Sequence, residues 1–155
     1  MDEKERFQEN LLLIRRTVGW TADEFGDRIG VTRQTINNLE AKRNKLNKTQ
    51  YIAMRAVLDA EMAASPKDTE MLQCLLDVLV DNPGKYSSED IEALVRKANM
   101  LTPSIIAGTT ARKDVSDELM GSARALGLVS AFAAGAVVAG STSKWLLKLI
   151  SKMKE

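Results

Sequence analysis

The stretch from residue 20 to residue 40, WTADEFGDRIGVTRQTINNLE, constrains the fold of this chain more than any other part of it. Thr21 followed by Glu24 has the spacing of a capping box, in which the Thr hydroxyl accepts from an orphan backbone N–H and the Glu reaches back. Gly30 stands just past this first helical pattern, where a left-handed residue commonly ends a helix. Thr32 then offers a second N-cap. The stretch therefore predicts two capped helices joined by a tight turn.

The second of these helices has two chemically different faces. Ile36 and Leu39 form its apolar stripe. Its opposite face carries the polar side chains Arg33, Gln34, Thr35, Asn37 and Asn38. These side chains have the donor–acceptor geometry that can read base edges in a major groove. The arrangement is typical of a helix-turn-helix with a recognition helix.

Residues 10–62 resemble the Cro/repressor-type (Xre-like) helix-turn-helix proteins of phages and bacteria. The resemblance rests on a polar face that begins T-R-Q-T, on the ending Leu39-Glu40, and on the small, turn and core positions Phe25, Gly26, Ile29, Gly30, Val31, Ile36 and Leu39. It implies a DNA-binding regulator, most often a repressor, that acts as a homodimer on a palindromic double-stranded operator. Two positions depart from the family pattern: Ala22 replaces a Gln that braces against the DNA backbone, and Ala41-Lys42 replaces Asn-Gly.

The resemblance and the residue chemistry together imply a set of site residues. An ion pair in the family joins its first helix to the Glu that ends the recognition helix, and Arg15 and Glu40 match these two positions. We expect base contacts from the recognition helix that Thr32 caps, and backbone contacts from residues around it. The expected DNA-binding residues are Thr21, Thr32, Arg33, Gln34, Thr35, Asn37, Asn38, Lys42, Arg43 and Lys45.

The charge distribution agrees with this expectation, although the net charge of +1 does not indicate nucleic acid. Between residues 28 and 58 there are seven basic residues and a single acidic one, Glu40, so this segment carries +6. A local basic footprint on the reading element is the electrostatic sign of DNA binding. The loop at residues 41–48 holds four of these cations, which suits phosphate oxygens that position a protein without specifying sequence.

The composition argues against an enzyme. The chain has no histidine, which excludes His-based acid–base chemistry and His metal ligation. Cys74, the one cysteine, stands among leucines, where a buried inert thiol is expected. There is no Gly-rich phosphate loop and no metal-spaced cluster, so we expect no cofactor and no metal. A lone cysteine and a charged N-terminus without an apolar core indicate a cytoplasmic protein.

The remaining pattern predicts an all-α protein whose first domain covers residues 1–64. A first helix is expected over residues 5–18, with Trp20 as a hydrophobic staple before the Thr21 cap. Asn47 and Gln50 form a capping box for a helix at residues 48–63, which closes a core of four to five helices.

Residues 66–110 are predicted to form a helical hairpin and a candidate dimerisation region. Its first helix is expected at residues 68–80 and is very apolar, and the turn at residues 81–84 is followed by a second helix capped by Ser87 or Ser88. A helix this apolar packs on more than one side. The hairpin is therefore expected to pack on the first domain or on a second subunit, with packing as part of one core as the alternative.

Residues 111–155 are predicted to be an apolar and then amphipathic helical tail. Residues 125–143 carry no charge and place Gly127, Ala131, Gly135 and Ala139 at every fourth position, a pattern that lets helices approach closely. The last twelve residues separate an apolar face from a lysine face; these faces comprise Trp145, Leu146, Leu149, Ile150 and Met153, and Lys144, Lys148 and Lys152. A protein–protein seam, a peripheral membrane contact and a loosely ordered tail all remain open here. The first two of these support an alternative function, a protein-interaction or antitoxin-like module that is membrane-associated in one form through residues 125–155.

Overall fold

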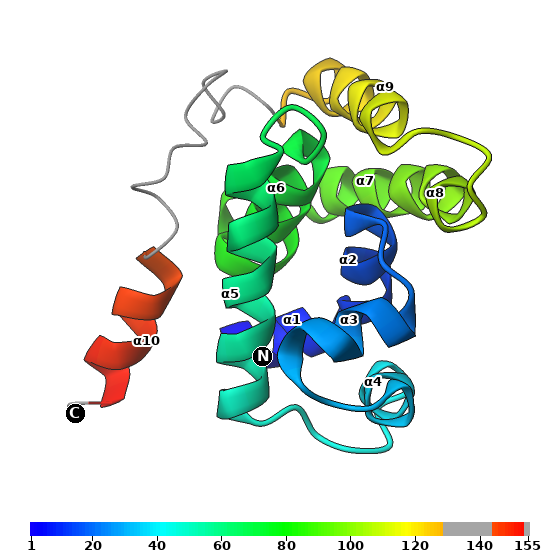
Figure 1. Cartoon of the computed structure of the whole chain (residues 1–155). Coiled ribbons are helices and arrows are strands. Elements are labelled where there is room, and N and C mark those ends of the chain that lie inside the picture. Colours follow the sequence, from blue (N-terminus) through cyan, green and yellow to red (C-terminus); the bar gives the residue numbers. More distant parts are fainter. Residues whose placement is uncertain (129–143, 154–155) are drawn as a thin grey trace.

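The computed structural model describes residues 1–128 and 144–153, and these residues form helices and no strand (Figure 1). The N-terminal region consists of five helices, α1 (Glu3–Glu9), α2 (Leu11–Val18), α3 (Ala22–Ile29), α4 (Arg33–Glu40) and α5 (Lys48–Ala64). It is followed by α6 (Glu70–Leu76), the π-helix η1 (Asp77–Asp81), the short 3-10 turn η2 (Pro83–Lys85), α7 (Ser88–Leu101), α8 (Pro103–Ile106), α9 (Arg112–Ala125) and α10 (Lys144–Met153). The predicted all-α class is confirmed.

The prediction of one helix over residues 5–18 is wrong, because the chain bends between α1 and α2 at Asn10. This residue has φ −107° and ψ 13°, outside the α-helical range. Its side-chain Nδ2 donates to the Arg6 carbonyl at 2.9 Å. An Asn side chain that bonds nearby backbone competes with helix continuation. The bend leaves Phe7 on α1 and Leu11 on α2 both fully buried.

Two predicted local motifs of the N-terminal region are present. Trp20 packs on Phe25 with 5.8 Å between ring centroids, which is the hydrophobic staple that sets the entry into α3. At the start of α5, the Gln50 N–H donates to Asn47 Oδ1 at 2.8 Å, and the Asn47 N–H donates to Gln50 Oε1 at 3.1 Å. This is the reciprocal capping box that the sequence predicts.

The predicted helix over residues 68–80 begins later and changes its winding before it ends. It is α-helical only from Glu70 to Leu76, and η1 continues it as a π-helix. The Asn82 N–H donates to the Asp77 carbonyl, five residues back, at 2.8 Å. The Asp77 carboxylate accepts from Asn82 Nδ2 and from the Tyr86 hydroxyl, which closes the wide turn. Local π turns of this kind often accompany functional or packing constraints.

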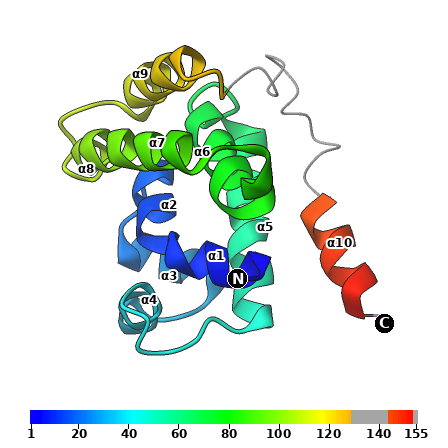
Figure 2. The same ribbon diagram turned by 180° about the vertical axis from the view of Figure 1, so that it is seen from behind.

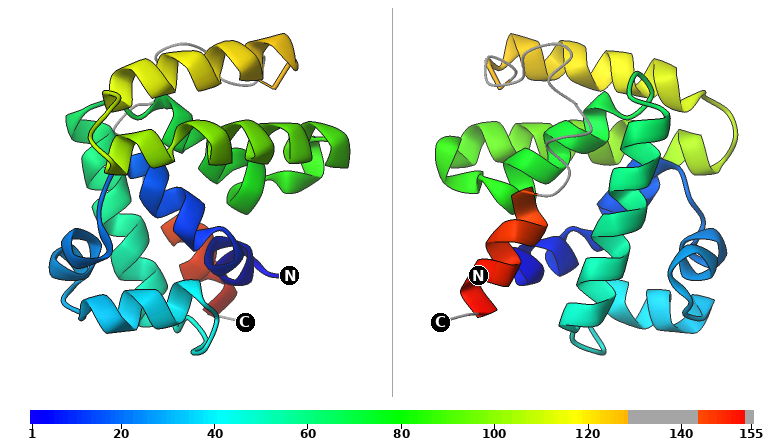
Figure 3. Two further views of the ribbon diagram at one scale, coloured as in Figure 1. Left: turned by 90° about the vertical axis from the view of Figure 1, so that its right-hand side faces the viewer. Right: turned by 60° about the vertical axis from the view of Figure 1, so that its left-hand side comes forward.

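The predicted hairpin packs on the N-terminal helices of the same chain, because Arg6 Nε of α1 donates to the Val80 carbonyl of η1 at 2.8 Å. Helix α9, at the start of the predicted tail 111–155, packs on α6 and α7 as well. Arg112 at the start of α9 donates to the Val18 carbonyl at 3.0 Å and to Glu61 Oε1 at 2.8 Å, which ties α9 to the ends of α2 and α5. The Met71 N–H of α6 donates to the buried Ser116 hydroxyl of α9 at 3.2 Å. Figure 3 shows α9 at one end of the molecule, above α7, and α4 at the opposite end.

Cys74 of α6 is fully buried in this core. Burial, and then the nearby Asp77 carboxylate, raises the pKa of the Cys74 thiol to about 12. The thiol therefore stays protonated at neutral pH, as expected for a structural cysteine.

Helix α10 lies beside α5, on the side away from α3 (Figures 1 and 2). Its Trp145 is buried and Leu149 packs against the core, whereas Leu147 is 62% exposed and Ile150 is 41% exposed. Within residues 1–128 and 144–153, the helices are too short or too polar to cross a bilayer. The predicted small-residue ladder at Ala131, Gly135 and Ala139 lies outside the described residues.

Candidate nucleic-acid interface

The helices α3 and α4 each begin at a threonine that caps the backbone. The Glu24 N–H donates to Thr21 Oγ1 at 3.1 Å, and the Thr35 N–H donates to Thr32 Oγ1 at 3.1 Å. The predicted capping box at Thr21 is formed only in part. The Glu24 carboxylate accepts from the Thr21 hydroxyl at 3.2 Å and not from the Thr21 backbone N–H. Both hydroxyls nevertheless fix where their helices begin.

Two glycines set the angle between α3 and α4. Gly30 has φ +80°, a left-handed conformation that ends α3. A Cβ at Gly26 would lie 2.6 Å from the Val31 carbonyl oxygen, so only glycine allows the turn to close on α3. The predicted helix-turn-helix geometry therefore depends on steric conditions that these two positions meet.

The outer face of α4 is polar. Arg33 and Gln34 are exposed, and Thr35, Asn37 and Asn38 are half-buried. Arg33 approaches Asp23 of α3 at 3.9 Å, with both side chains about two-thirds exposed. An exposed ion pair of this length contributes little, so the Arg33 guanidinium can turn to another partner at small cost.

Hydrogen bonds connect the face of α4 to the residues that follow the helix. Gln34 Nε2 donates to Asn38 Oδ1 at 3.3 Å, and Arg43 Nη1 donates to the same oxygen at 3.3 Å. The structure thereby brings Gln34, Asn38 and Arg43 together. Thr32 and Thr35 share a hydrogen bond between their hydroxyls at 3.0 Å, so both are already engaged at the N-terminus of α4.

The C-terminus of α4 ends in a left-handed residue that is not glycine. Lys42 has φ +61°. The Arg43 N–H donates to the Asn38 carbonyl at 2.9 Å and the Lys42 N–H donates to the Leu39 carbonyl at 3.2 Å, which is the Schellman pattern. At these two positions the sequence has Ala41-Lys42, where the Cro/repressor-type pattern has Asn-Gly. The chain keeps the usual helix ending, with a lysine in a position that favours glycine.

Residues 41–47, which follow α4, form the basic loop. Its cations Lys42, Arg43 and Lys45 are exposed, and only Leu46 is buried. Lys42 Nζ lies 2.6 Å from Glu9 Oε2 in an ion pair that is half exposed. The loop therefore presents cations on the same end of the molecule as α4 (Figure 3).

The exposed positive charge near α4 is smaller than the seven basic residues between residues 28 and 58 suggest. Arg55, one of the seven basic residues counted, is only 3% exposed and forms an ion pair with Asp81 at 2.9 Å. It is an internal residue and contributes no surface charge. Arg28 lies over the Trp20 ring, 4.0 Å from its centroid.

The ion pair between Arg15 and Glu40 is present in the structure. Arg15 Nε donates to Glu40 Oε2 at 2.6 Å and Nη2 donates to Oε1 at 3.0 Å, a bidentate arrangement. Arg15 Nη1 also donates to the Trp20 carbonyl at 3.0 Å. One guanidinium thereby links α2, the entry into α3 and the end of α4.

One contributor to this region was missed by the sequence reasoning. Gln8 of α1 bonds to the end of α4 and to the basic loop, through Leu39, Asn44 and Leu46. These partners lie 31 to 38 residues away along the chain. A glutamine on a helix carries no periodic or capping signal that predicts such partners.

Comparison with known families identifies the central part of this region. Residues 11–63 match the family model described as helix-turn-helix, which covers α2 to α5 and leaves α1 outside. The resemblance to Cro/repressor-type proteins is thereby confirmed over this segment, which is a DNA-binding type of domain. Comparisons of the chain with curated proteins and with solved structures gave no match.

Proposed function

From the helix-turn-helix domain at residues 11–63, we propose that this protein is a sequence-specific DNA-binding regulator that reads a major groove with α4. The observation that carries the proposal is the outer face of α4. Its polar side chains are free of the core, the helix is held by caps at Thr32 and by the Arg15–Glu40 pair, and exposed cations follow it directly. Direct readout of base edges needs a rigidly held helix whose exposed polar side chains can adjust to the bases.

The proposed roles follow from position on this surface. Arg33, Gln34 and Asn38 contact base edges, and Thr35 and Asn37 contact bases or adjacent phosphates. The phosphate backbone of the DNA is contacted by Thr21, Lys42, Arg43 and Lys45. Thr32 acts at the N-terminus of α4, where its hydroxyl already caps the helix.

We further propose a cytoplasmic homodimer that represses transcription from a palindromic operator. A single module of this size makes few contacts, and two-fold pairing doubles them. In such a dimer the two α4 helices lie about one DNA turn apart, roughly 34 Å. The helices after α5 supply the surface for pairing in this proposal.

A second candidate function is a protein-interaction or antitoxin-like module that docks a partner or a membrane surface through its C-terminal region. The observation that favours it is the outer side of α10, where Leu147 and Ile150 are exposed to 62% and 41%. Exposed apolar side chains of this kind on one short helix often mark an interaction surface.

The test is a selection of bound fragments from a random double-stranded DNA pool with the full-length protein. An enriched palindromic motif supports the regulator. The Arg33→Ala variant should bind the motif more weakly and lose the preference at one of its base pairs, and Arg96→Ala, which removes an exposed arginine from α7, serves as the matched control. Weak binding without enrichment, together with capture of a partner protein or of vesicles, favours the second candidate.

A further inference from the structure

Helix α1 precedes the residues that match the helix-turn-helix family, yet it is bonded to the loop that follows α4. We propose that α1 is part of the DNA-binding apparatus and that Gln8 is its positioning residue. Gln8 holds the basic loop in the shape that presents Lys42, Arg43 and Lys45 to consecutive phosphates. This inference rests on the proposed function and names a further residue for the same site.

Both N–H groups and the oxygen of the Gln8 amide have partners in this region. Nε2 donates to the Leu39 carbonyl at 3.1 Å and to the Asn44 carbonyl at 2.8 Å. Oε1 accepts from the Leu46 N–H at 2.9 Å. Leu39 lies in the last turn of α4, and its carbonyl also accepts from the Lys42 N–H, whereas the other two residues lie at the far side of the loop. A single side chain thus fixes the distance between the start and the end of the basic loop.

Such a support matters because the other contacts of the loop lie at its two ends or on the surface; they include the backbone bonds that end α4, the half-exposed Lys42–Glu9 pair and the capping box at Asn47. Its cations are exposed, Leu46 is its one buried side chain, and Lys42 has a left-handed conformation that costs a lysine free energy. If the loop were loose, ordering it on DNA would cost conformational entropy and reduce the affinity. The bonds from Gln8 remove that cost before binding.

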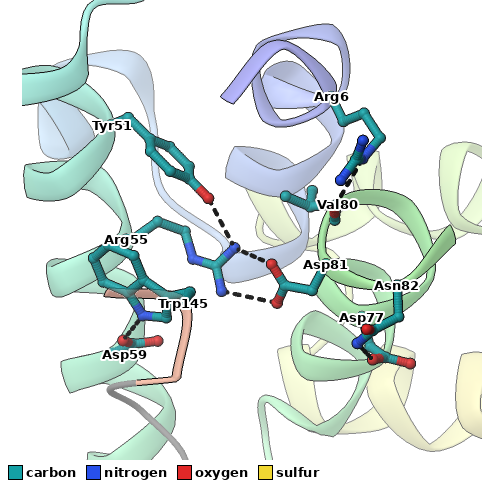
Figure 4. A network of polar contacts seen from close by, with 9 residues as sticks. All are labelled: Arg6, Tyr51, Arg55, Asp59, Asp77, Val80, Asp81, Asn82 and Trp145. Atoms are coloured by element: carbon teal, nitrogen blue, oxygen red, sulfur yellow. Dashed lines mark hydrogen bonds and ion pairs between the residues drawn. The ribbon is translucent and has the colours of Figure 1, made fainter. Parts of the chain in front are cut away.

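Helix α1 can act as a support because it is itself fixed to the core. Phe7 is fully buried and its ring packs edge-on against Tyr51 of α5, with 5.1 Å between centroids. From the same helix, Arg6 Nε donates to the Val80 carbonyl of η1 at 2.8 Å, a contact shown in Figure 4. A seven-residue helix has little stability of its own, so these tertiary contacts hold it. Because α1 is fixed on α5 and η1, the bonds from Gln8 also fix the position of the basic loop relative to these helices.

The experiment compares Gln8→Met, which keeps the length of the side chain and removes its hydrogen bonds, with the full-length wild-type protein. Ser87→Ala removes the N-cap of α7 far from α4 and is the control for a general loss of stability. Binding to the selected operator is titrated at several salt concentrations. Amide hydrogen exchange of residues 41–47 is measured on the same proteins without DNA.

Gln8→Met is expected to weaken binding roughly tenfold and to lower the salt slope of log K by about one to two units, because about 0.9 is lost per phosphate contact. The base preference should be kept, and exchange in the basic loop should rise. Ser87→Ala should keep the wild-type slope. Gln8→Glu can accept from Leu46 but cannot donate to the two carbonyls, so without DNA it should show the same rise in exchange of the basic loop as Gln8→Met.

A wild-type salt slope in Gln8→Met, measured while that variant is folded, would overturn the inference. So would unchanged exchange of the basic loop, or the same slope loss in Ser87→Ala. These outcomes leave the proposed function intact, because the wild-type protein still selects its operator. If the wild-type protein selects no operator and shows no salt-dependent binding, the proposed function fails and the inference fails with it.

Discussion

Trp145 of α10 donates its indole N–H to the Asp59 carboxylate of α5 at 2.5 Å, across 86 residues of sequence (Figure 4). The same indole ring lies 5.2 Å from the Arg55 guanidinium and 5.9 Å, edge-on, from the Tyr51 ring. Arg55 in turn forms a bidentate pair with Asp81 of η1. The last helix is thus anchored to a buried polar network that joins α5 to η1.

Replacing Trp145 with Phe should lower the free energy of unfolding by about 1–3 kcal/mol, because the half-buried Asp59 carboxylate loses its donor. Urea unfolding at pH 7 measures this change. In an Asp59→Asn background the cost should be smaller, since the lost interaction is then no longer with a charge. Equal costs in both backgrounds would show that ring packing, and not this hydrogen bond, holds α10.

Replacing Asp81 with Ala should cost about 3–5 kcal/mol, because it leaves the Arg55 guanidinium buried without its counter-charge. Arg55 has little room to compensate, since its Nε already lacks a partner among the described residues. Asp117→Ala is the matched control, because Asp117 pairs with Lys113 on the exposed side of α9. That control should change stability by less than about 0.5 kcal/mol. Similar losses in the two variants would contradict a special role for the buried pair.

Replacing Glu3 with Gln should raise stability at neutral pH. Burial, followed by the Asp81 carboxylate, raises the pKa of Glu3, while Tyr51 and Arg55 lower it. The folded state therefore binds this proton more tightly than the unfolded chain. The wild-type protein accordingly loses stability as the pH rises from 4.5, the ordinary pKa of a glutamate side chain, through the higher pKa of Glu3 in the folded state.

The gain of Glu3→Gln should be complete above the folded-state pKa of Glu3. It should be absent below pH 4.5, where Glu3 is protonated in both the folded and the unfolded wild-type chain. Thermal unfolding between pH 4 and pH 8 checks this, with the exposed Glu92→Gln as control. A gain that does not change with pH would show that the charge of Glu3 is not its source.

Replacing Lys42 with Gly should separate stability from DNA binding. Glycine relieves the positive φ of residue 42, so the free energy of unfolding should stay constant or rise by about 1 kcal/mol. The half-exposed pair with Glu9 contributes little against this gain. Affinity for the operator should fall, since a phosphate contact is lost. Lys45→Ala should lower affinity and the salt slope without stabilising the fold. A clear destabilisation by Lys42→Gly would contradict the predicted strain.

Replacing Arg33 with Ala should cost about 1–3 kcal/mol of specific binding and relax the preference at one base pair. The exposed pair with Asp23 should not matter for folding, so the melting temperature should stay close to that of the wild-type protein. Titrations against the selected operator and against random DNA measure the two effects. An equal loss on both DNAs would make Arg33 a phosphate contact instead of a base contact.

The parts of the fold that sequence reasoning predicted are those stabilised by neighbours along the chain. The caps at Thr21 and Thr32, the box of Asn47 with Gln50 and the left-handed Gly30 all act within a few residues. Their chemistry is visible as spacing. The pairing of Arg15 with Glu40 spans 25 residues and came from the family resemblance rather than from spacing.

The two errors in helix boundaries have a local physical cause, because a polar side chain within each apolar pattern bonds to groups a few residues away. The apolar pattern of residues 5–18 continues through Asn10, and the pattern of residues 68–80 continues through Asp77. In the structure these polar side chains bond nearby groups, and the helix breaks at the first and widens at the second. The surface charge was overestimated because of tertiary packing, since the sequence does not reveal that Arg55 is buried beside Asp81.

The sequence alone therefore determined the α3–turn–α4 unit, the polar face of α4 and the basic loop after it, because caps, turns and helical periodicity are set by contacts over short stretches of chain. Only the tertiary structure decided that Gln8 holds the basic loop, that Arg55 is an internal residue and that Trp145 anchors α10 on Asp59. These contacts join residues tens of positions apart. They exist because the helices pack around one shared core, and no residue pattern within a single helix encodes its partner in another.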